Sequence, residues 1–515
     1  MADLLLVNAD VITMDRARPR AGEIAVKQGR ILAVGKGNEL RNLKDHRTEV
    51  VDLGGKTVLP GLIDAHLHLR ALAESLVTLN IGPTDAIRSI EDIKGAIRRE
   101  AEKLPPGSWI RAGGYHEAHL TEKRHPNRKD LDEAAPNHPV KLTHRSGHAH
   151  VLNSLALNLI QVSKETPEPL EGIIERDLDT GEPNGQFFGL GDFLSNRIPP
   201  LEERRLDRGV RLASQELLAS GITSIQDASS RNDHNRLNQM RRWKTDGSLK
   251  CRVSMMLGLK GFQERLAGRF SFSDLEIKNQ LRLQGVKIIL DETTGRLNPG
   301  QSELNEIVLS VHQAGFQAAI HAVEETAIES ALIALENAQQ ISPRTDHRHR
   351  VEHCSVCPPP LADRLASLKI LVVTHPAFIY YSGKRYLETV PPAQLDYLYP
   401  LNMLIQKGVQ VAAGSDAPLV PVNPLAGIYG AVSRKTSSGE EVLPGEKVTV
   451  YEALRLYTEL AAMAAFEETD KGVIAPGKLA DFVVLSDDPM KIPLETMETI
   501  QVQMTILGGE VVWRR

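Results

Sequence analysis

The feature that most constrains the fold is an alternation of strand-like and helix-like segments through the middle of the chain. Eight apolar runs recur over about 400 residues, and helical patterns such as GVRLASQELLAS and NEIVLSVHQAG lie between most of them. This alternation predicts a (β/α)8 barrel (TIM barrel) with insertions. The competing architecture, an open doubly wound sheet, would need an early glycine-rich phosphate turn, which we do not find. The eight runs are LPGLIDAHLHL (59–69), GITSIQDA (221–228), RVSMMLGL (252–259), VKIILDET (286–293), FQAAIHAV (316–323), RVEHCSV (350–356), ILVVTHPAF (370–378) and VQVAAGSDAP (409–418).

Both ends of the chain have an all-β pattern instead. Residues 3–57 and 472–515 carry short β-branched runs that are broken by Gly, Asn and Asp turns. Neither segment is long enough to form a stable hydrophobic core by itself, because domains below roughly 60 residues have only marginal stability. We therefore expect residues 1–57 and 471–515 to pair into one composite β-sandwich, with the barrel domain over residues 58–470.

A further segment, from about residue 80 to 200, does not belong to the eight alternating units. It holds two more strand-like runs, SWIRAGGYH and HPVKLTHRSGH, with Pro- and Asn-rich connections. We expect an insertion after the first barrel strand that covers the mouth of the active site.

Composition places the chain among globular enzymes. The 515 residues are 41% hydrophobic and 25% charged, and the net charge of −5 argues against nucleic acid or a membrane as the main partner. Three cysteines cannot build a disulfide framework, and neither a signal peptide nor an apolar stretch of about 18 residues is present. The expected location is the cytoplasm and the expected partner is a small-molecule substrate, and a homodimer is compatible with this sequence.

The strongest chemical signal is His66-x-His68 in the first run. Residues i and i+2 of a strand point the same way, so both imidazoles face the barrel interior, where neutral histidines can share a metal ion. The structural alternative is a pair of hydrogen-bonded core histidines.

Other residues that can bind metal or move protons stand at the ends of later runs. The carboxyl ends of parallel barrel strands meet at one face, where catalysis takes place, so these side chains are expected to converge. They are Lys287, His321, His353, His375 and Asp416.

On these motifs the chain resembles the amidohydrolase superfamily, and within it the YtcJ-like amidohydrolases that include N-substituted formamide deformylases. The matching stretches span nearly the whole chain and include LPGLIDAHLHL, SWIRAGGYH, SGHAHVLNS, VKIILDETTG, RVEHC, THPAFIYYSGKRY, GSDAP and GVIAPGKLADFVVL. The resemblance implies a metallohydrolase barrel with a composite β-sandwich and one or two divalent ions, with zinc expected. The ligands that it implies are His66, His68, His321, His353 and Asp416, with a carboxylated Lys287 where two ions are bridged.

Lys287 and Asp416 each have two interpretations. An ammonium group cannot bind a cation, whereas reaction with CO2 gives a carbamate with two bridging oxygens. The alternative for Lys287 is an interior ion pair with a carboxylate, which would leave one metal ion. The Asp416 carboxylate can accept a proton from the nucleophilic water and deliver it to the leaving nitrogen. Its alternative is a helix N-cap before Pro418.

Several residues could shape the pocket. His375-Pro376 and Ser146-Gly147-His148 depart from the Gln-Pro and Asp-Gly-His of many relatives, so both are expected either in the substrate pocket or directly behind its lining. His375 could be a further ligand, a hydrogen-bond donor to the substrate carbonyl or a core residue. A loop is expected after the seventh strand, and it carries Tyr380, Tyr381 and Arg385. These side chains would suit an apolar or aromatic substrate.

Three further motifs are expected to have structural rather than catalytic roles. Glu324 in His321-x-x-Glu324 echoes deaminases of the superfamily, although a surface glutamate that opens a helix is favoured. Cys354-x-x-Cys357 has no second pair, so we expect buried or half-buried thiols rather than a zinc site. The basic run at residues 347–350 is expected to be a solvated or salt-bridged turn.

The sequence thus predicts a metal-dependent hydrolase of a non-peptide C–N bond, in an amide or an N-substituted formamide. One alternative is an aminohydrolase that releases ammonia from a heterocyclic amine. The other is a non-catalytic scaffold with the same barrel, against which the complete ligand set argues.

Overall fold

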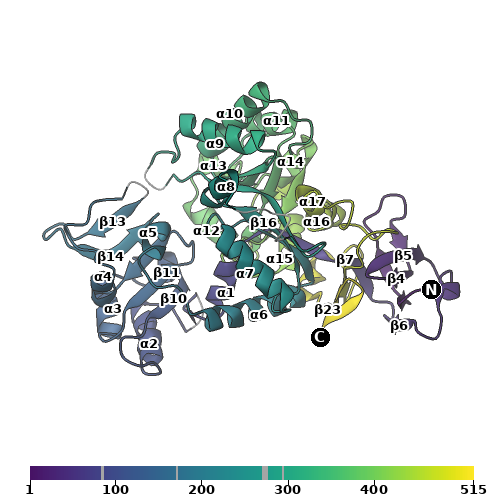
Figure 1. The fold of residues 1–515 in the computed structure, drawn as a ribbon, viewed down its shortest axis with the longest axis horizontal. Coiled ribbons are helices and arrows are strands. Elements are labelled where there is room, and N and C mark those ends of the chain that lie inside the picture. The colour runs from purple at the N-terminus through teal and green to yellow at the C-terminus, as the bar shows by residue number, and fades with distance from the viewer. Residues whose placement is uncertain (83–85, 170–171, 270–275, 293–294) are drawn as a thin grey trace. The chain divides into compact units, whose positions relative to one another are not determined.

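The computed structural model describes residues 1–82, 86–169, 172–269, 276–292 and 295–515 (Figure 1). Residues 83–85 and 170–171 of the expected insertion, Thr293 of the fourth run, and Thr294 of VKIILDETTG lie outside this description. Contacts divide the chain into two compact units. The first unit comprises Met1–Leu69, Ala213–Leu290 and Gln301–Arg515, and the second comprises Arg70–Leu212 and Asp291–Gly300.

The first unit contains a sheet of eight strands, in which every paired neighbour is parallel. The strands follow one another in chain order and each overlaps one of the eight runs of the sequence, which confirms the (β/α)8 barrel. They are β8 (Leu62–Leu67), β15 (Ile222–Asp227), β16 (Arg252–Leu257), β17 (Leu281–Ile289), β18 (Gln317–Ala322), β19 (Arg350–His353), β20 (Leu371–Thr374) and β21 (Val411–Ala413).

The residues after β21 bring the last strand against the first. The Asp416 amide donates to the His66 carbonyl at 2.7 Å, and the His68 amide donates to the Ala417 carbonyl at 3.0 Å. A Cβ on Gly414 would lie 2.5 Å from the His66 nitrogen, so only glycine allows this approach. The barrel is therefore nearly closed at the point where the candidate ligands stand.

Helices with one apolar face cover the barrel. On α9 (Gln301–Gln313), for example, Leu304, Val308 and Val311 are buried at helical spacing. Figure 1 shows α9, α10 and α11 together on one side of the barrel. The helices that precede or follow the barrel strands are α6 (Glu203–Ala219), α7 (His234–Thr245), α8 (Leu259–Leu266), α9, α10 (Glu325–Ile341), α11 (Pro359–Ser367), α12 (Ala377–Thr389), α13 (Pro392–Leu395), α14 (Leu401–Gln406), α15 (Pro424–Ser433), α16 (Val450–Leu456) and α17 (Glu459–Ala464).

Strands from the two ends of the chain share a sheet and a core. The antiparallel pairing of β22 (Phe482–Leu485) with β7 (Thr57–Pro60) joins them, and Leu6, Val58 and Phe482 belong to one buried cluster. The contacts do not separate these strands from the barrel, so the boundaries at residues 57 and 471 stay predictions. One sheet is β5-β4-β1-β6, the other is β24-β23-β22-β7-β2-β3, and the remaining bounds are β1 (Leu4–Val7), β2 (Asp10–Ile12), β3 (Arg20–Ala21), β4 (Glu23–Lys27), β5 (Arg30–Gly35), β6 (Glu49–Asp52), β23 (Val502–Leu507) and β24 (Glu510–Arg514).

The second unit is built on a mixed sheet of six strands, in the order β13-β14-β12-β11-β10-β9. The two runs noted in the sequence form neighbouring parallel strands of this sheet, β10 (Ile110–Tyr115) and β11 (Val140–His144). The other four strands have two to six residues, and one contains Pro-Asn-Gly, so their pattern is too weak to predict them. They are β9 (Leu79–Asn80), β12 (Ala149–Leu152), β13 (Ile173–Arg176) and β14 (Pro183–Phe188), and the helices are α1 (Leu69–Ser75), α2 (Ile90–Ala101), α3 (Arg128–Ala134), α4 (Ser154–Leu159) and α5 (Gly191–Ser195).

Within the described part of the chain, we find no helix with the length and apolar character needed to cross a bilayer.

Candidate metal centre

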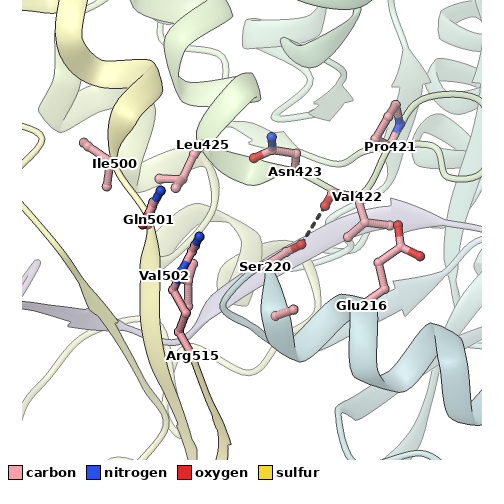
Figure 2. A pocket seen from close by; sticks show the side chains of 11 residues that line it. Glu216, Ser220, Pro421, Val422, Asn423, Leu425, Ile500, Gln501, Val502 and Arg515 are labelled. Carbon is pink, nitrogen blue, oxygen red and sulfur yellow. Dashed lines mark hydrogen bonds between the residues drawn. The ribbon is translucent and has the colours of Figure 1, made fainter. Parts of the chain in front are cut away.

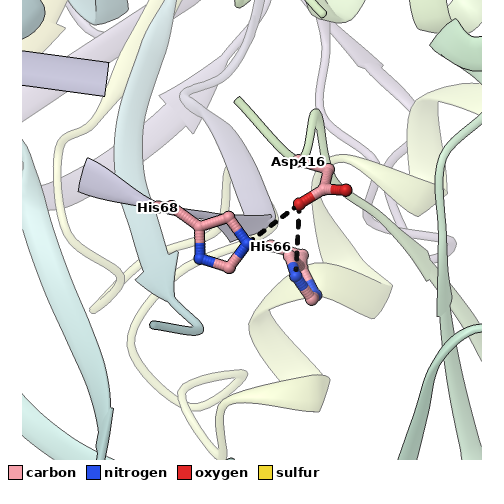
Figure 3. Close-up of side chains that lie close together, drawn as sticks. All are labelled: His66, His68 and Asp416. Carbon is pink, nitrogen blue, oxygen red and sulfur yellow. Dashed lines mark ion pairs between the residues drawn. The ribbon is translucent and has the colours of Figure 1, made fainter. Parts of the chain in front are cut away.

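The end of the first barrel strand supplies two imidazoles. His66 is on β8 and fully buried, while His68 follows the strand and keeps about a third of its side chain exposed. Their Nε2 atoms lie 3.6 Å and 3.0 Å, respectively, from Oδ1 of Asp416 (Figure 3). The two histidines therefore face the same carboxylate, as the His-x-His spacing predicts.

Asp416 stands between two groups of potential ligands. One group is His66, His68 and Asp416, the other is His353, His375 and Asp416, and the ligand atoms of each group lie within 4.8 Å of one another. The Asp416 backbone has a left-handed conformation, with φ of 57°. The hydrogen bond from its amide to the His66 carbonyl holds it in this conformation. A carboxylate shared by two ligand groups is suited to one ion or to two neighbouring ions.

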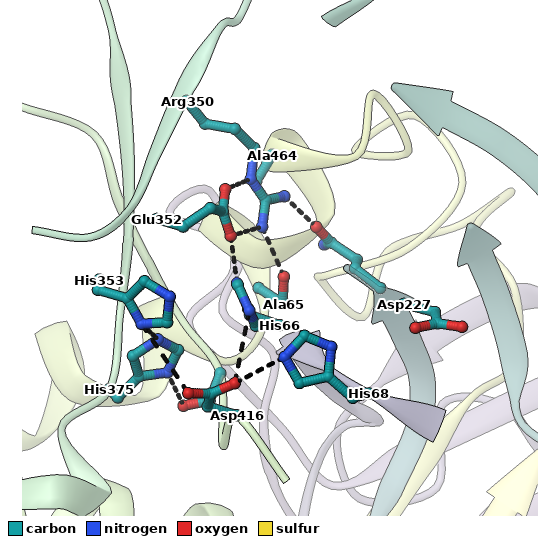
Figure 4. Close-up of polar contacts among 12 residues, drawn as sticks. Ala65, His66, His68, Asp227, Arg350, Glu352, His353, His375, Asp416 and Ala464 are labelled. Atoms are coloured by element: carbon teal, nitrogen blue, oxygen red, sulfur yellow. Dashed lines mark hydrogen bonds and ion pairs between the residues drawn. The ribbon is translucent and has the colours of Figure 1, made fainter. Parts of the chain in front are cut away.

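The later strands complete the cluster. The ring of His353, at the end of β19, lies 5.0 Å from that of His66, 4.3 Å from that of His321 on β18, and 4.7 Å from that of His375. Lys287 is on β17 and His375 directly follows β20. Figure 4 shows four histidines gathered around Asp416, which are His66, His68, His353 and His375.

A buried ion pair that the sequence analysis missed orients His66. Glu352 accepts a hydrogen bond from His66 Nδ1 and pairs with Arg350, whose guanidinium also donates to the Ala65 carbonyl at 2.7 Å and to Gln226 Oε1 at 2.5 Å (Figure 4). Because His66 donates from Nδ1, its lone pair is on Nε2, which faces Asp416. A carboxylate behind a metal-binding histidine fixes the ring in this way in many metal sites.

Polar contacts also orient the ring of His68. Its Nδ1 lies 3.4 Å from Ser229 Oγ, which in turn donates to Asp227 Oδ1 at 2.6 Å. Asp227 ends β15, so the second strand contributes to the site through a hydrogen-bonded partner of a ligand.

The hydrogen bonds of His375 limit its role. Its Nδ1 donates to the Gly414 carbonyl at 3.0 Å, and its Nε2 lies 2.8 Å from His353 Nδ1. Burial lowers the pKa of His375, so the ring is neutral at pH 7 and Nε2 carries a lone pair. With Nδ1 as the donor, Nε2 has no proton to give to a substrate carbonyl, and a ligand role for His375 stays a prediction.

Lys287 is the unusual member of the site. Its side chain is completely buried, and Nζ has no hydrogen-bond partner among the described residues. Burial lowers the pKa of Lys287 to about 8, because the charged amine is poorly solvated inside the barrel. The neutral amine is the form that reacts with CO2.

The charges around Asp416 keep it ionised. Burial opposes ionisation, but the hydrogen bond from His68, together with the electrostatic influence of the surrounding imidazoles, outweighs it and holds the pKa of Asp416 well below its usual range. In contrast, burial raises the pKa of Asp64, which accepts amide hydrogen bonds from His66 and Ser415, to about 6.

These donors fit a metal ion. Imidazole and carboxylate groups suit Zn²⁺ and related divalent ions. His66 Nε2 is buried without a hydrogen-bond partner among the described residues, as expected for an atom that faces an ion. Burial, followed by the charge of Lys287, lowers the pKa of His66 to about 3, so the ring is neutral and able to bind.

The proposed pocket residues lie on different elements. Tyr380, Tyr381 and Arg385 are on α12 and not in a loop, because the helix starts immediately after His375-Pro376. Tyr380 contacts Tyr381 and Tyr429, and Arg385 lies over the Tyr386 ring. His148 is exposed in the connection between β11 and β12 of the second unit. Binding of substrate by these four residues stays a prediction.

The three motifs that were expected to have structural roles can be compared with the structure. Glu324 is exposed at the N-cap of α10, as expected for a glutamate that opens a helix. Cys354 and Cys357 are free and buried.

The expectation of a solvated or salt-bridged turn at residues 347–350 is confirmed only in part, because both arginines form ion pairs, Arg348 with Asp346 and Glu468. His347, His349 and Arg350 are buried, because the chain enters β19 here and Arg350 finds Glu352 inside the barrel.

A separate hollow of about 330 Å³ lies beside the start of β15 (Figure 2). Glu216, Ser220, Asn423 and Arg515 are among its lining residues, and Ser220 Oγ donates to the Val422 carbonyl at 2.7 Å. None of the candidate ligands lines it, so this hollow is not part of the metal centre.

Comparison with known proteins agrees with this geometry. The amidohydrolase family model matches residues 49–513. The chain is 31% identical to N-substituted formamide deformylase of Arthrobacter pascens, over 100% of this chain and 99% of the relative. It is 28% identical to the protein YtcJ of Bacillus subtilis, over 98% of each.

A solved structure has the same fold. An uncharacterized metal-dependent hydrolase of Pyrococcus furiosus superposes with a TM-score of 0.74 at 24% identity, over 95% of this chain and all of the other. Together with the match over residues 49–513, these likenesses confirm the resemblance seen in the sequence. The chain belongs to the amidohydrolase family.

Proposed function

We propose that this protein hydrolyses a non-peptide C–N bond, in an amide or an N-substituted formamide of a small molecule. The observation that carries the proposal is the pair of ligand groups that share Asp416 at the end of the barrel. The substrate class is supported by the full-length likeness to a formamide deformylase. The reaction adds water across the bond, so that a formamide gives an amine and formate.

The chain offers a complete set of metal ligands for this reaction. His66, His68, His321, His353 and Asp416 would hold one or two divalent ions, and zinc suits their chemistry. A bound ion supplies Lewis-acid activation of water and of the scissile carbonyl. His375 would serve as a further ligand, since its Nε2 lone pair lies beside His353.

Asp416 is proposed to move the proton. It is ionised and lies 3.0 Å from His68 Nε2, at the centre of the ligand cluster. The carboxylate accepts a proton from the attacking water and donates it to the leaving nitrogen, which departs as a neutral amine. Tyr380, Tyr381, Arg385 and His148 are retained as proposed substrate contacts.

The activity can be tested directly. The chain, purified without an affinity tag and loaded with zinc, should release formate and amine from a panel of N-alkyl and N-aryl formamides, and chelation should abolish the release. Ammonia release from heterocyclic amines, lost in Glu324→Gln, would instead identify an aminohydrolase. Metal binding without turnover of either panel would support a scaffold.

Lys287 gives a prediction that depends on pH. We propose that its neutral amine reacts with CO2 to form a carbamate and a proton, and that the two carbamate oxygens would help to hold two ions. With the pKa of Lys287 at about 8, the neutral fraction rises from roughly one tenth at pH 7 to one half at pH 8. At a fixed concentration of dissolved CO2, supplied by bicarbonate, zinc should therefore reactivate the metal-free enzyme faster as the pH rises toward 8, and the rate should level off above that pH.

The control is Lys471→Ala, since Lys471 is also buried but is paired with Glu467 and Ser224. The bicarbonate dependence should persist in this variant and disappear in Lys287→Ala, together with one of two bound ions. An active Lys287→Ala variant that binds as much metal as the unmodified chain would contradict the carbamate.

A further inference from the structure

A second cluster of metal-binding side chains lies in the second unit and includes none of the residues assigned to the barrel centre. His116 and Glu117 directly follow β10, and His144 is the last residue of β11. These strands are parallel and Tyr115 is paired with His144, so the three side chains emerge at the same edge of the sheet.

The distances in this cluster suit a common ion. Glu117 Oε2 lies 3.0 Å from His144 Nε2 and 3.5 Å from His116 Nδ1. One ligand atom from each of the three residues can be chosen so that all lie within 4.8 Å of one another. Two ligands of a tetrahedral zinc ion, at about 2.0–2.1 Å from the metal, are separated by about 3.3 Å.

Two atoms of the cluster lack the hydrogen bonds that burial demands. Glu117 Oε2 and His144 Nε2 are both buried and have no hydrogen-bond partner among the described residues, although they are only 3.0 Å apart. The His144 side chain is about nine-tenths buried. Close contact without a well-directed hydrogen bond is the arrangement of two ligands that converge on a third atom.

Neighbouring groups hold the rings in place. Ser146 Oγ lies 2.7 Å from His144 Nδ1, and the Tyr115 hydroxyl lies 2.8 Å from Nδ1 of His125, whose Nε2 is 3.8 Å from Glu117 Oε2. A contact of this kind on the outer nitrogen orients an imidazole for metal binding through the inner one. Burial lowers the pKa of both His144, to about 4, and His125, so both rings are neutral at pH 7.

We propose that His116, Glu117 and His144 bind a divalent transition-metal ion of the zinc class, with His125 as the nearest further donor. Imidazole ligands disfavour Mg²⁺ and Ca²⁺, which prefer oxygen. The ion would join the ends of β10 and β11 to the segment that carries His125, and so act as a structural clip within the second unit.

Zinc stoichiometry tests this proposal. The full chain, freed of metal and dialysed against zinc-buffered solutions, should bind one more ion than the double variant Glu117→Gln/His144→Asn. His148→Asn is the matched control, because this exposed histidine lies four residues beyond His144 and should leave the stoichiometry unchanged. Equal zinc content in the double variant and the unmodified chain would overturn the proposal.

A second measurement does not depend on the variant folding. Crystals of the zinc-loaded, unmodified chain should show an anomalous scattering peak among His116, Glu117 and His144, in addition to any peak in the barrel. Anomalous density confined to the barrel would exclude the second site, whatever the activity of the enzyme.

Discussion

Asp416→Asn is expected to lower kcat for formamide hydrolysis by about 10²–10⁴-fold, the contribution typical of a positioned acid–base group. The amide has nearly the shape of the carboxylate but cannot accept the proton of the attacking water. Because Asp416 is also a candidate ligand of both groups, bound metal must be measured beside the rate. Retained metal with lost turnover would separate proton transfer from metal binding.

Glu324→Gln is the matched control for this change, since Glu324 is exposed at a helix N-cap and has the same charge. It should hydrolyse formamides at the unmodified rate. An Asp416→Asn enzyme with full metal content and a kcat within a few-fold of the unmodified enzyme would contradict the proposed proton transfer.

Arg350→Met is expected to reduce the free energy of unfolding by about 3–5 kcal/mol, because it leaves the buried Glu352 carboxylate without its cation. Arg350 and Glu352 are both fully buried, and the arginine charge holds the pKa of Glu352 well below its usual value despite burial. The shift in the midpoint of urea unfolding, followed by circular dichroism, measures the loss.

Two further variants make this test specific. Arg348→Met removes a partly exposed arginine that pairs with Asp346 and Glu468, and should cost at most about 1 kcal/mol. Arg350→Met/Glu352→Met removes both buried charges and should recover much of the stability lost in the single variant. A double variant less stable than Arg350→Met would show that the uncompensated carboxylate is not the cause.

Local sequence patterns were enough to find the barrel strands and most of the candidate ligands. Each strand is a short apolar run, and His66, His321 and Asp416 stand within or just after such runs. Once the strands are parallel, their carboxyl ends must meet, so the convergence needs no knowledge of which strands are neighbours.

Strand periodicity is misleading at the end of β19. Strict alternation would place Glu352 and His353 on opposite faces. The left-handed backbone at His353, with φ of 71°, ends the alternation, so that His66 contacts both side chains. The helical position of Tyr380 and Tyr381 was missed for a related reason, since α12 starts with no loop after His375-Pro376.

The sequence by itself determined the eight-stranded barrel and the residues that stand at its catalytic end, because both follow from the period of the apolar residues and the direction of the chain. Only the tertiary structure decided how these residues are supported. Glu352 meets His66 across 286 positions of sequence and Arg350 meets Ala65 across 285, while His116 and Glu117 meet His144 across two strands. Such contacts depend on the register between strands, and no local pattern encodes that register.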